Sequence, residues 1–247
     1  MRSILGQKLN RRGPTVWVKK WVDYSSKYGL GYTLSNGACG VYFNDNSKIL
    51  RDAAGKLVTY VERHTASRQE QIDQYQIDEA PKEIRKKVLL LKHFAEYLEG
   101  SKDEFQEESE PEQPVATGRS SAFAGGNAGA ATGAHAGLLS PKAAVEKNVV
   151  MVKKWMRTKH AILFRLNNKV VQVCFQDNSQ IILCSDSRLV CYVSRQGMRQ
   201  TMPLQEALDS ADQDMVKRLK YTKDVVATMI ESAGRKGASS AQPLPLP

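Results

Sequence analysis

The segment Phe43-Asn-Asp-Asn-Ser-Lys-Ile-Leu50 returns 132 residues later as Phe175-Gln-Asp-Asn-Ser-Gln-Ile-Ile182. Two further pairs match in the same order at nearly the same spacing: Thr59-Tyr-Val-Glu-Arg63 with Cys191-Tyr-Val-Ser-Arg195, and Lys19-Lys-Trp21 with Lys153-Lys-Trp155. Two copies are too few for a solenoid, which needs at least about three stacked units. The sequence therefore predicts two similar small domains in tandem, packed on each other.

The composition is that of an ordinary globular protein. The chain has 247 residues, of which 41% are hydrophobic, and this predicts one or two domains with normal cores. No apolar run approaches the ~18 residues that a membrane-spanning helix needs. Residues 1–8 are interrupted by polar side chains too early for a secretory signal peptide. We therefore expect no membrane contact.

The four cysteines, Cys39, Cys174, Cys184 and Cys191, include no Cys-x-x-Cys pair. Three of them lie in apolar, strand-like segments, which favours buried reduced thiols over a metal site or a disulfide. The four histidines stand outside any recognisable nucleophile–base motif. We expect an intracellular protein without a metal or a cofactor.

The net charge of +10 is distributed unevenly. Six carboxylates fall within residues 103–112, whereas lysine and arginine are scattered through both copies and the two ends. No arginine-rich arm and no aromatic RNA-binding motif accompanies them. Nucleic acid is therefore an unlikely partner, and an acidic or phosphorylated protein partner suits the charge equally well.

The chain changes character in its middle. Residues 101–147 are first acidic and then rich in Ala, Gly and Ser, so they bury too little apolar surface to offset their ordering entropy. We interpret them as a flexible linker between domains at 15–100 and 148–234, with flexible tails at 1–14 and 235–247.

Each copy contains strands first and a helix last. Short apolar stretches separated by turn signals predict strands at 31–34, 40–43, 48–50 and 57–62, and at 161–166, 170–175, 181–184 and 189–193. Apolar stripes with helical spacing follow: Ile84, Val88, Leu91, Ala95 and Leu98, then Met215, Leu219, Val226 and Met229 or Ile230, with Gly234 as the stop. An antiparallel meander plus a helix, repeated, is an α+β architecture.

The chain resembles the polo-box domain of polo-like kinases in segments of both copies. The opening of that domain is similar to Trp17-Val-Lys-Lys-Trp-Val-Asp-Tyr-Ser-Ser-Lys-Tyr-Gly-Leu-Gly-Tyr32 and Gly40-Val-Tyr-Phe-Asn-Asp45. Its first helix is similar to Lys87-Val-Leu-Leu-Leu-Lys-His-Phe94, and its second box to the stretch from Trp155-Met-Arg157 through Phe175-Gln-Asp177 to Ile182-Leu-Cys184. The resemblance covers about residues 15–100 and 148–233.

The resemblance implies two polo boxes, each a six-stranded antiparallel sheet with a C-terminal helix. In that family, partner peptides carrying phosphoserine or phosphothreonine lie between the boxes. In that family, the domain lies in the same chain as a Ser/Thr kinase domain and targets this kinase to its partners. The resemblance therefore implies a protein of the cytoplasm and nucleus that is recruited to cytoskeletal or microtubule-organising structures, such as the centrosome, basal body, spindle or kinetochore. This chain has no kinase motif of the G-x-G-x-x-G-x-V, H-R-D or D-F-G type, so we do not expect an enzyme.

The resemblance also implies the residues that contact the peptide: Val18, Trp21, Val22, Asp23, Leu90 and Leu91. Trp21 matches the tryptophan that packs on the peptide, and a rigid amphipathic ring is a typical binding anchor. Leu91 also lies on the apolar stripe of its helix, so core packing is a competing interpretation.

The phosphate half of the site departs from the family. The family holds phosphate with a His-x-Lys pair, and the matching positions here are the neutral Asn178 and Gln180. Arg157 and Lys159 are the cations that could compensate. Weaker dependence on phosphate is therefore expected. A plain hairpin turn is a competing interpretation of the Asp177-Asn-Ser179 triplet, because the first copy carries the same triplet.

Three functions remain open from the sequence. The first is a module that binds partner peptides with reduced dependence on phosphate. The second is a structural module for dimerisation or for binding a cytoskeletal scaffold, and the third restrains the kinase domain in cis.

Overall fold

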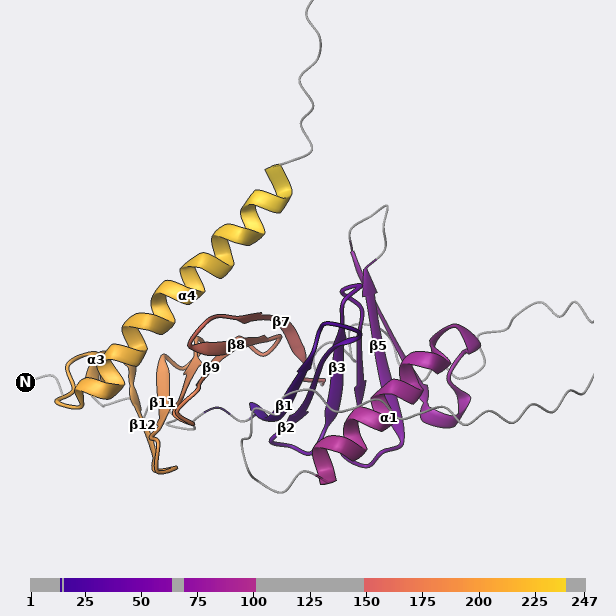
Figure 1. The fold of residues 1–247 in the computed structure, drawn as a ribbon, viewed down its shortest axis with the longest axis horizontal. Coiled ribbons are helices and arrows are strands. Elements are labelled where there is room, and N and C mark those ends of the chain that lie inside the picture. The colour runs from indigo at the N-terminus through magenta and orange to yellow at the C-terminus, as the bar shows by residue number, and fades with distance from the viewer. Residues whose placement is uncertain (1–13, 15, 64–68, 101–148, 239–247) are drawn as a thin grey trace, which may run out of the picture.

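The computed structural model describes residues 14, 16–63, 69–100 and 149–238. They form two α+β units, one from each copy of the repeat, which we call box 1 and box 2 (Figure 1). The predicted linker at 101–147 lies outside the described residues. So do the predicted tails, apart from residue 14 and residues 235–238.

Each box is a six-stranded antiparallel meander followed by a helix, which confirms the predicted fold class. Box 1 comprises β1 (Val18–Tyr24), β2 (Gly29–Leu34), β3 (Cys39–Phe43), β4 (Lys48–Arg51), β5 (Leu57–Arg63), β6 (Glu70–Gln76), the short 3-10 helices η1 (Ile77–Glu79) and η2 (Lys82–Ile84), and α1 (Arg85–Gly100). Box 2 comprises β7 (Val152–Arg157), β8 (Ala161–Leu166), β9 (Val170–Phe175), β10 (Gln180–Cys184), β11 (Leu189–Val193), β12 (Arg199–Pro203), α3 (Leu204–Leu208) and α4 (Gln213–Ala238).

The repeated segments form equivalent hairpins, β3–β4 and β9–β10, as predicted. In these hairpins Tyr42 pairs with Lys48, and Cys174 pairs with Gln180. The residue pattern missed the outer strands of both sheets and the short α3. The predicted stop at Gly234 is wrong, because α4 continues to Ala238. One glycine inside a helix costs only about 1 kcal/mol relative to alanine, so a long helix can pass through it.

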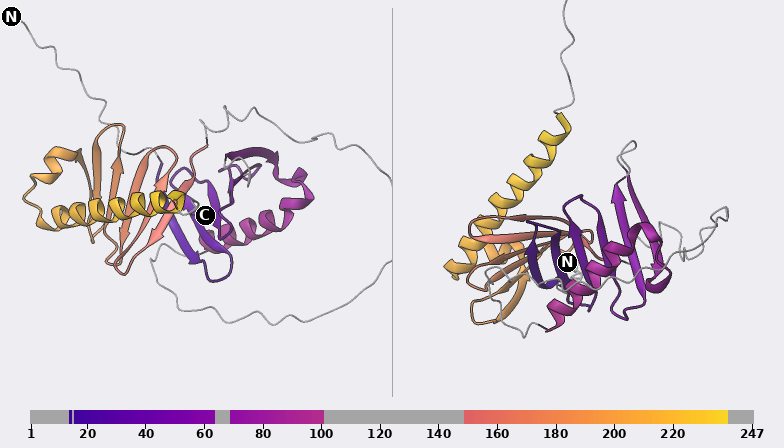
Figure 2. Two further views of the ribbon diagram at one scale, coloured as in Figure 1. Left: turned by 90° about the horizontal axis from the view of Figure 1, so that it is seen from above. Right: turned by 45° about the vertical axis from the view of Figure 1, so that its right-hand side comes forward.

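Each sheet has an outer face covered by its own helix and an inner face turned toward the other box (Figures 1 and 2). On the outer face of box 1, strand residues pack beneath the apolar stripe of α1: Cys39, Val41, Phe43, Ile49 and Val58 against Val88, Leu91, Phe94 and Leu98. Gly31 permits this close approach, because a Cβ atom there would lie 2.4 Å from the Phe94 ring. The predicted stripe of α1 is therefore a core stripe.

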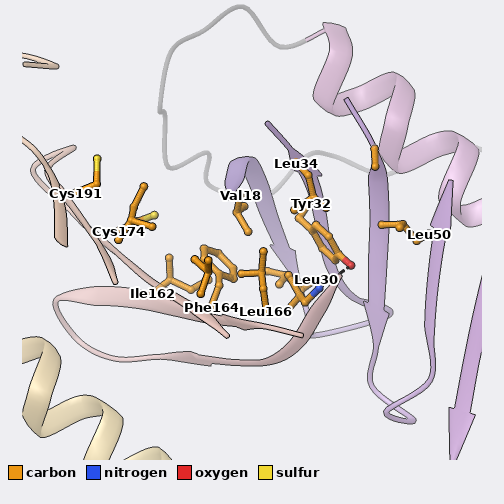
Figure 3. Packing of buried hydrophobic residues seen from close by; sticks show 14 residues of the cluster. Val18, Leu30, Tyr32, Leu34, Leu50, Ile162, Phe164, Leu166, Cys174 and Cys191 are labelled. Atoms are coloured by element: carbon orange, nitrogen blue, oxygen red, sulfur yellow. Dashed lines mark hydrogen bonds between the residues drawn. The ribbon is translucent and has the colours of Figure 1, made fainter. Parts of the chain in front are cut away.

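The inner faces form one continuous core between the boxes (Figure 3). Box 1 contributes Leu30, Tyr32 and Leu34, which are fully buried or nearly so. Box 2 contributes an equivalent set from β8, namely Ile162, Phe164 and Leu166. Burial of apolar area at about 25 cal/mol per Å² makes this shared core the main attraction between the boxes.

Two sets of hydrogen bonds, which we call the locks, cross this core, one in each direction. The backbone N–H of Val18 in box 1 donates to Gln172 Oε1 at 2.8 Å, and Gln172 Nε2 donates back to the Val18 carbonyl at 2.9 Å. In the other direction, the backbone N–H of Val152 in box 2 donates to the Tyr32 hydroxyl at 3.2 Å. Val18 and Val152 occupy equivalent places, as the first residues of β1 and β7. Each box thus satisfies a buried backbone group of the other.

The two locks use opposite members of the same cross-strand pair. Tyr32 pairs with Gly40 in box 1, and Phe164 pairs with Gln172 in box 2. A Cβ atom on Gly40 would lie 2.5 Å from the Tyr32 hydroxyl oxygen, so the tyrosine needs glycine opposite it. Phe164 lacks the hydroxyl, which leaves space for the amide of Gln172. Each box therefore hydrogen-bonds to the backbone of the other, box 1 through the hydroxyl of Tyr32 and box 2 through the amide of Gln172.

Candidate functional site

The first strands of the two boxes, β1 and β7, are sheet edges and lie where the boxes meet (Figure 1). From its start to its end, β1 passes over successive strands of box 2. Val18 bonds to Gln172 on β9, Trp21 meets Phe164 on β8, and Asp23 pairs with Arg157 on β7. The strand therefore brings its inward side chains to box 2 in order.

Trp21 lies at the centre of this junction. Its ring is half-buried against the shared core, with its centroid 6.1 Å from that of Phe164. The indole Nε1 atom is buried and has no hydrogen-bond acceptor among the described residues. The indole N–H is therefore an unsatisfied donor, and a buried donor of this kind costs about 1–3 kcal/mol.

Asp23 and Arg157 form an ion pair between the boxes next to Trp21. The nearest nitrogen and oxygen are 3.3 Å apart, and the side chains are 12% and 46% exposed respectively. Asp23 also accepts the backbone N–H of Ser25, which holds the turn after β1. A partly exposed pair of this kind contributes about 0–1 kcal/mol to stability, so its main effect is on local charge and geometry.

The remaining predicted peptide residues pack in the hydrophobic cores. Val18 is buried in the shared core, and Val22 points to the opposite face of β1, toward α1, because successive strand residues alternate. Leu91 is fully buried beneath α1, and Leu90 is partly buried in the same cluster. Val22, Leu90 and Leu91 therefore pack in the core between α1 and its sheet, whereas Trp21 packs on the shared core. The full burial of Leu91 is what the competing interpretation, core packing, expects.

Of the predicted phosphate positions in box 2, Asn178 and Lys159 are exposed, whereas Gln180 is half-buried. Asn178 is exposed in the β9–β10 turn with φ at 65°, and Lys159 is exposed after β7. Gln180 is half-buried on the inner face, where its Oε1 atom accepts from Gln172 Nε2 at 3.0 Å. The neutral side chain at position 180 is therefore part of the lock between the boxes.

One row of directly paired residues crosses the inner face of box 2: Arg157, Ile162, Cys174, Gln180, Val193 and Arg199. Its two ends are cationic, and Gln180 lies between them. Arg199 stacks on Trp17 of box 1, with 4.0 Å from the guanidinium carbon to the ring centroid. Sequence reasoning missed Arg199, because residues 199–203 lack the apolar alternation that marks a strand.

The repeated Asp-Asn-Ser triplet forms a clamp between hairpin and helix. In box 2, the Asp177 carboxylate accepts from the Ser179 hydroxyl at 2.6 Å, and Arg218 of α4 donates to both residues. In box 1, Lys87 of α1 donates to Asp45 at 2.7 Å and to Ser47 at 2.6 Å. The aspartate and serine of the triplet are therefore structural in both boxes, as the competing hairpin interpretation holds.

The clamp makes the free energy of unfolding depend on pH in the acidic range. Partial burial opposes ionisation of Asp177, but hydrogen bonds from Ser179 and the charge of Arg218 outweigh it and lower its pKa below the ordinary value. A lowered folded-state pKa adds stability above the unfolded-state pKa of about 3.9, and this stability is lost as pH falls further. We expect Asp177→Asn to lower the free energy of unfolding by about 1 kcal/mol at pH 7.

Urea unfolding at pH 7 and pH 3 measures this difference, which should shrink at pH 3. Asp186→Asn is the matched control, because Asp186 and its partner Lys169 are 70% and 67% exposed. A constant deficit for Asp177→Asn at both pH values would contradict the acid linkage.

The described residues offer no site for a metal: no group of three or more His, Cys, Asp or Glu is placed to hold one. The four cysteines are free thiols, three of them buried and Cys184 half-buried. Among the helices of the described ranges, none has the length and apolar character to cross a membrane. The candidate site is built from aromatic, amide and ionic side chains where the two boxes meet.

Comparisons with known proteins show which family the chain resembles. Residues 26–88 and 158–219 match the family described as POLO box duplicated region. The chain is 43% identical over 200 residues to the probable serine/threonine-protein kinase CCRP1 of Zea mays, covering 81% of this chain and 26% of that protein. It is 30% identical over 222 residues to the serine/threonine-protein kinase plk-1 of Caenorhabditis elegans, covering 89% and 29%. The chain therefore spans less than a third of these relatives.

Solved structures share the fold. The polo-box domain of Cdc5 from budding yeast superposes with a TM-score of 0.64 at 22% identity, covering 92% of this chain and 82% of that one. The same yeast domain in complex with a Spc72 phosphopeptide gives a TM-score of 0.61 at 22% identity, covering 86% and 70%.

Proposed function

The chain belongs to the polo-box family, and from this premise we propose that it is a targeting and regulatory module that binds partner peptides between its two boxes. The chain itself is a non-catalytic module. The observation that carries the proposal is the meeting of Trp21 with Phe164 beside the Asp23–Arg157 pair. A solved yeast relative holds a phosphopeptide on the same fold, which supports a peptide as the partner.

Two edge strands at the junction support the same proposal. The β1 and β7 edges each have one side without a neighbouring strand in their sheet. An extended peptide can pair with such an edge through its backbone, while side-chain pockets supply specificity. Trp21 then acts as the anchor, because aromatic residues at the centre of an interface carry much of its binding energy.

Reduced dependence on phosphate is the second part of the proposal. Hydrogen bonds to charged groups contribute about 1.5–3 kcal/mol each. Both positions that match the family's His-x-Lys pair, Asn178 and Gln180, are neutral here. The loss of both cations therefore lowers the expected affinity for phosphate about a hundredfold. Arg157 already pairs with Asp23, and Lys159 lies on the rim. These positions favour a weak preference for phosphate.

A titration with paired peptides tests this proposal. A peptide containing Ser-phosphothreonine and its unphosphorylated twin should bind within about tenfold of each other, because no cationic pincer distinguishes them. Arg157→Ala should remove the residual preference, and added salt should weaken that preference in the native protein. A native preference of about a hundredfold for the phosphopeptide would contradict the assignment.

The wider role follows from the family alone. We propose that the module belongs to a Ser/Thr kinase, restrains the kinase domain in cis when no partner is bound, and recruits it to microtubule-organising structures. Full-length relatives bear the names of protein kinases, which supports this part.

A further inference from the structure

Gln172 is held in one orientation by the other box. Its side chain is fully buried, with Oε1 accepting from the Val18 N–H at 2.8 Å and Nε2 donating to the Val18 carbonyl at 2.9 Å. Rotating the amide by half a turn would place two donors face to face and two acceptors face to face. Buried polar groups without partners are costly, so the backbone of β1 determines which end of the amide faces inward.

This orientation limits the side chain at position 180. The Nε2 atom of Gln172 has two hydrogens: one points to the Val18 carbonyl, and the other to Gln180 Oε1 at 3.0 Å, with Cys174 Sγ as a further acceptor at 3.5 Å. Because a thiol is only a weak acceptor, position 180 must present an acceptor toward Gln172 to satisfy this amide fully. Glutamine and glutamate can do so, but a lysine ammonium has three donors and no acceptor.

Box 1 shows the opposite combination at the equivalent places. Gly40 stands where box 2 has Gln172, and Lys48 stands where box 2 has Gln180. Glycine has no amide side chain to oppose a cation, and the Lys48 ammonium pairs with Glu70 at 2.9 Å. Box 1 thus combines a lysine with a glycine at these two places, whereas box 2 combines two glutamines.

We propose that Gln172 is the specificity-determining residue that excludes a phosphate-binding cation from position 180. It positions the site without touching the partner: it fixes β1 against box 2 and requires a neutral or anionic acceptor beside it. The peptide part of this inference rests on the proposed function, whereas the exclusion of lysine rests on the hydrogen bonds alone.

The first test is thermal unfolding of single variants. Gln180→Lys should lower the melting temperature by about 2–8 °C, because it leaves Gln172 Nε2 facing a donor in a buried place. Gln180→Glu keeps the acceptor and should melt within about 2 °C of the native protein. The matched control is Gln176→Lys, the same chemical change near the turn of the same hairpin, where the side chain takes no part in the lock. The backbone N–H of Val18 should exchange its hydrogen faster in Gln180→Lys only.

The second test restores the family's cations in two backgrounds. Asn178→His with Gln180→Lys should leave the ratio of affinities for a Ser-phosphothreonine peptide and its unphosphorylated twin within about tenfold while Gln172 is present. Adding Gln172→Gly with Phe164→Tyr, which imports the box 1 pair, should raise this ratio above about tenfold. A merely structural Gln172 would change the melting temperature but not the ratio.

The outcomes are separable. If Gln180→Lys melts like Gln176→Lys, the proposed exclusion is wrong whatever the peptides do. If melting behaves as expected but the ratio rises fully with Gln172 in place, the specificity role is wrong. If neither peptide binds any variant, the proposed function fails and the specificity role fails with it, while the melting result still establishes the lock.

Discussion

Replacing Gln172 with glycine should lower the free energy of unfolding by about 3 kcal/mol, because a buried N–H and a buried carbonyl of Val18 both lose their hydrogen bonds. Each unsatisfied group costs about 1–3 kcal/mol, and glycine within a strand weakens it further. Urea unfolding followed by far-ultraviolet circular dichroism measures the loss.

Adding Phe164→Tyr to Gln172→Gly should recover at least about 1 kcal/mol of this loss. The double variant copies into box 2 the pair that Tyr32 and Gly40 form in box 1. Its new hydroxyl can accept the Val18 N–H, as the Tyr32 hydroxyl accepts that of Val152 at 3.2 Å. The same urea titration measures the recovery.

Phe164→Tyr alone is the control for this rescue. With Gln172 present there is no room for the hydroxyl, because even a Cβ atom opposite Tyr32 would lie 2.5 Å from the hydroxyl oxygen. The single variant should therefore be less stable than the native protein, and the pair should show a favourable coupling energy. Additive losses in the double variant would contradict the equivalence of the two locks.

Trp21→Ala should weaken binding of a partner peptide by about 2 kcal/mol or more, which is about thirtyfold in affinity. The indole is half-buried where the boxes meet and lies beside the Asp23–Arg157 pair. Removing it takes away a large apolar surface that β1 presents at this place. Isothermal titration with the partner peptide measures the change.

Trp155→Ala is the matched control for Trp21→Ala. Trp155 occupies the equivalent place on β7, and it is also half-buried against the shared core. Both variants should lose stability to a similar degree, so binding is compared well below both melting temperatures. Equal losses of affinity in the two variants would show that Trp21 acts through the fold rather than through contact with the peptide.

The local architecture was predictable because it depends on local periodicity. The spacing of Ile84, Val88 and Leu91 predicted a helix with a buried stripe, and the structure buries all three residues, although Ile84 lies in the 3-10 helix η2 just before α1. The repeated Phe-x-Asp-Asn-Ser segments predicted equivalent hairpins, and they occupy equivalent places. The end of α4 was predicted wrongly, because one glycine is a weak stop signal in a long helix.

The candidate site was only partly predictable, because it forms across two units. Trp21, Asp23 and Arg157 meet where the boxes join. Val22 and Leu91 lie on the other side of the box 1 sheet, since neighbours in sequence point to opposite faces of a strand. Arg199 and Gln172 carry no motif, and their importance comes from contacts with Trp17 and Val18 of the other box.

Residue patterns alone were enough to establish the duplication, the α+β class and the neutral side chains at positions 178 and 180. Each of these is encoded in residues close together in the chain or in their repetition. The side chains that face the junction and the hydrogen bonds that constrain position 180 are set by the packing of the two boxes. Gln172 and Val18 are 154 residues apart, and their hydrogen bonds arise from the packing of two complete sheets. No local pattern encodes that packing, because it depends on the shapes of both inner faces together.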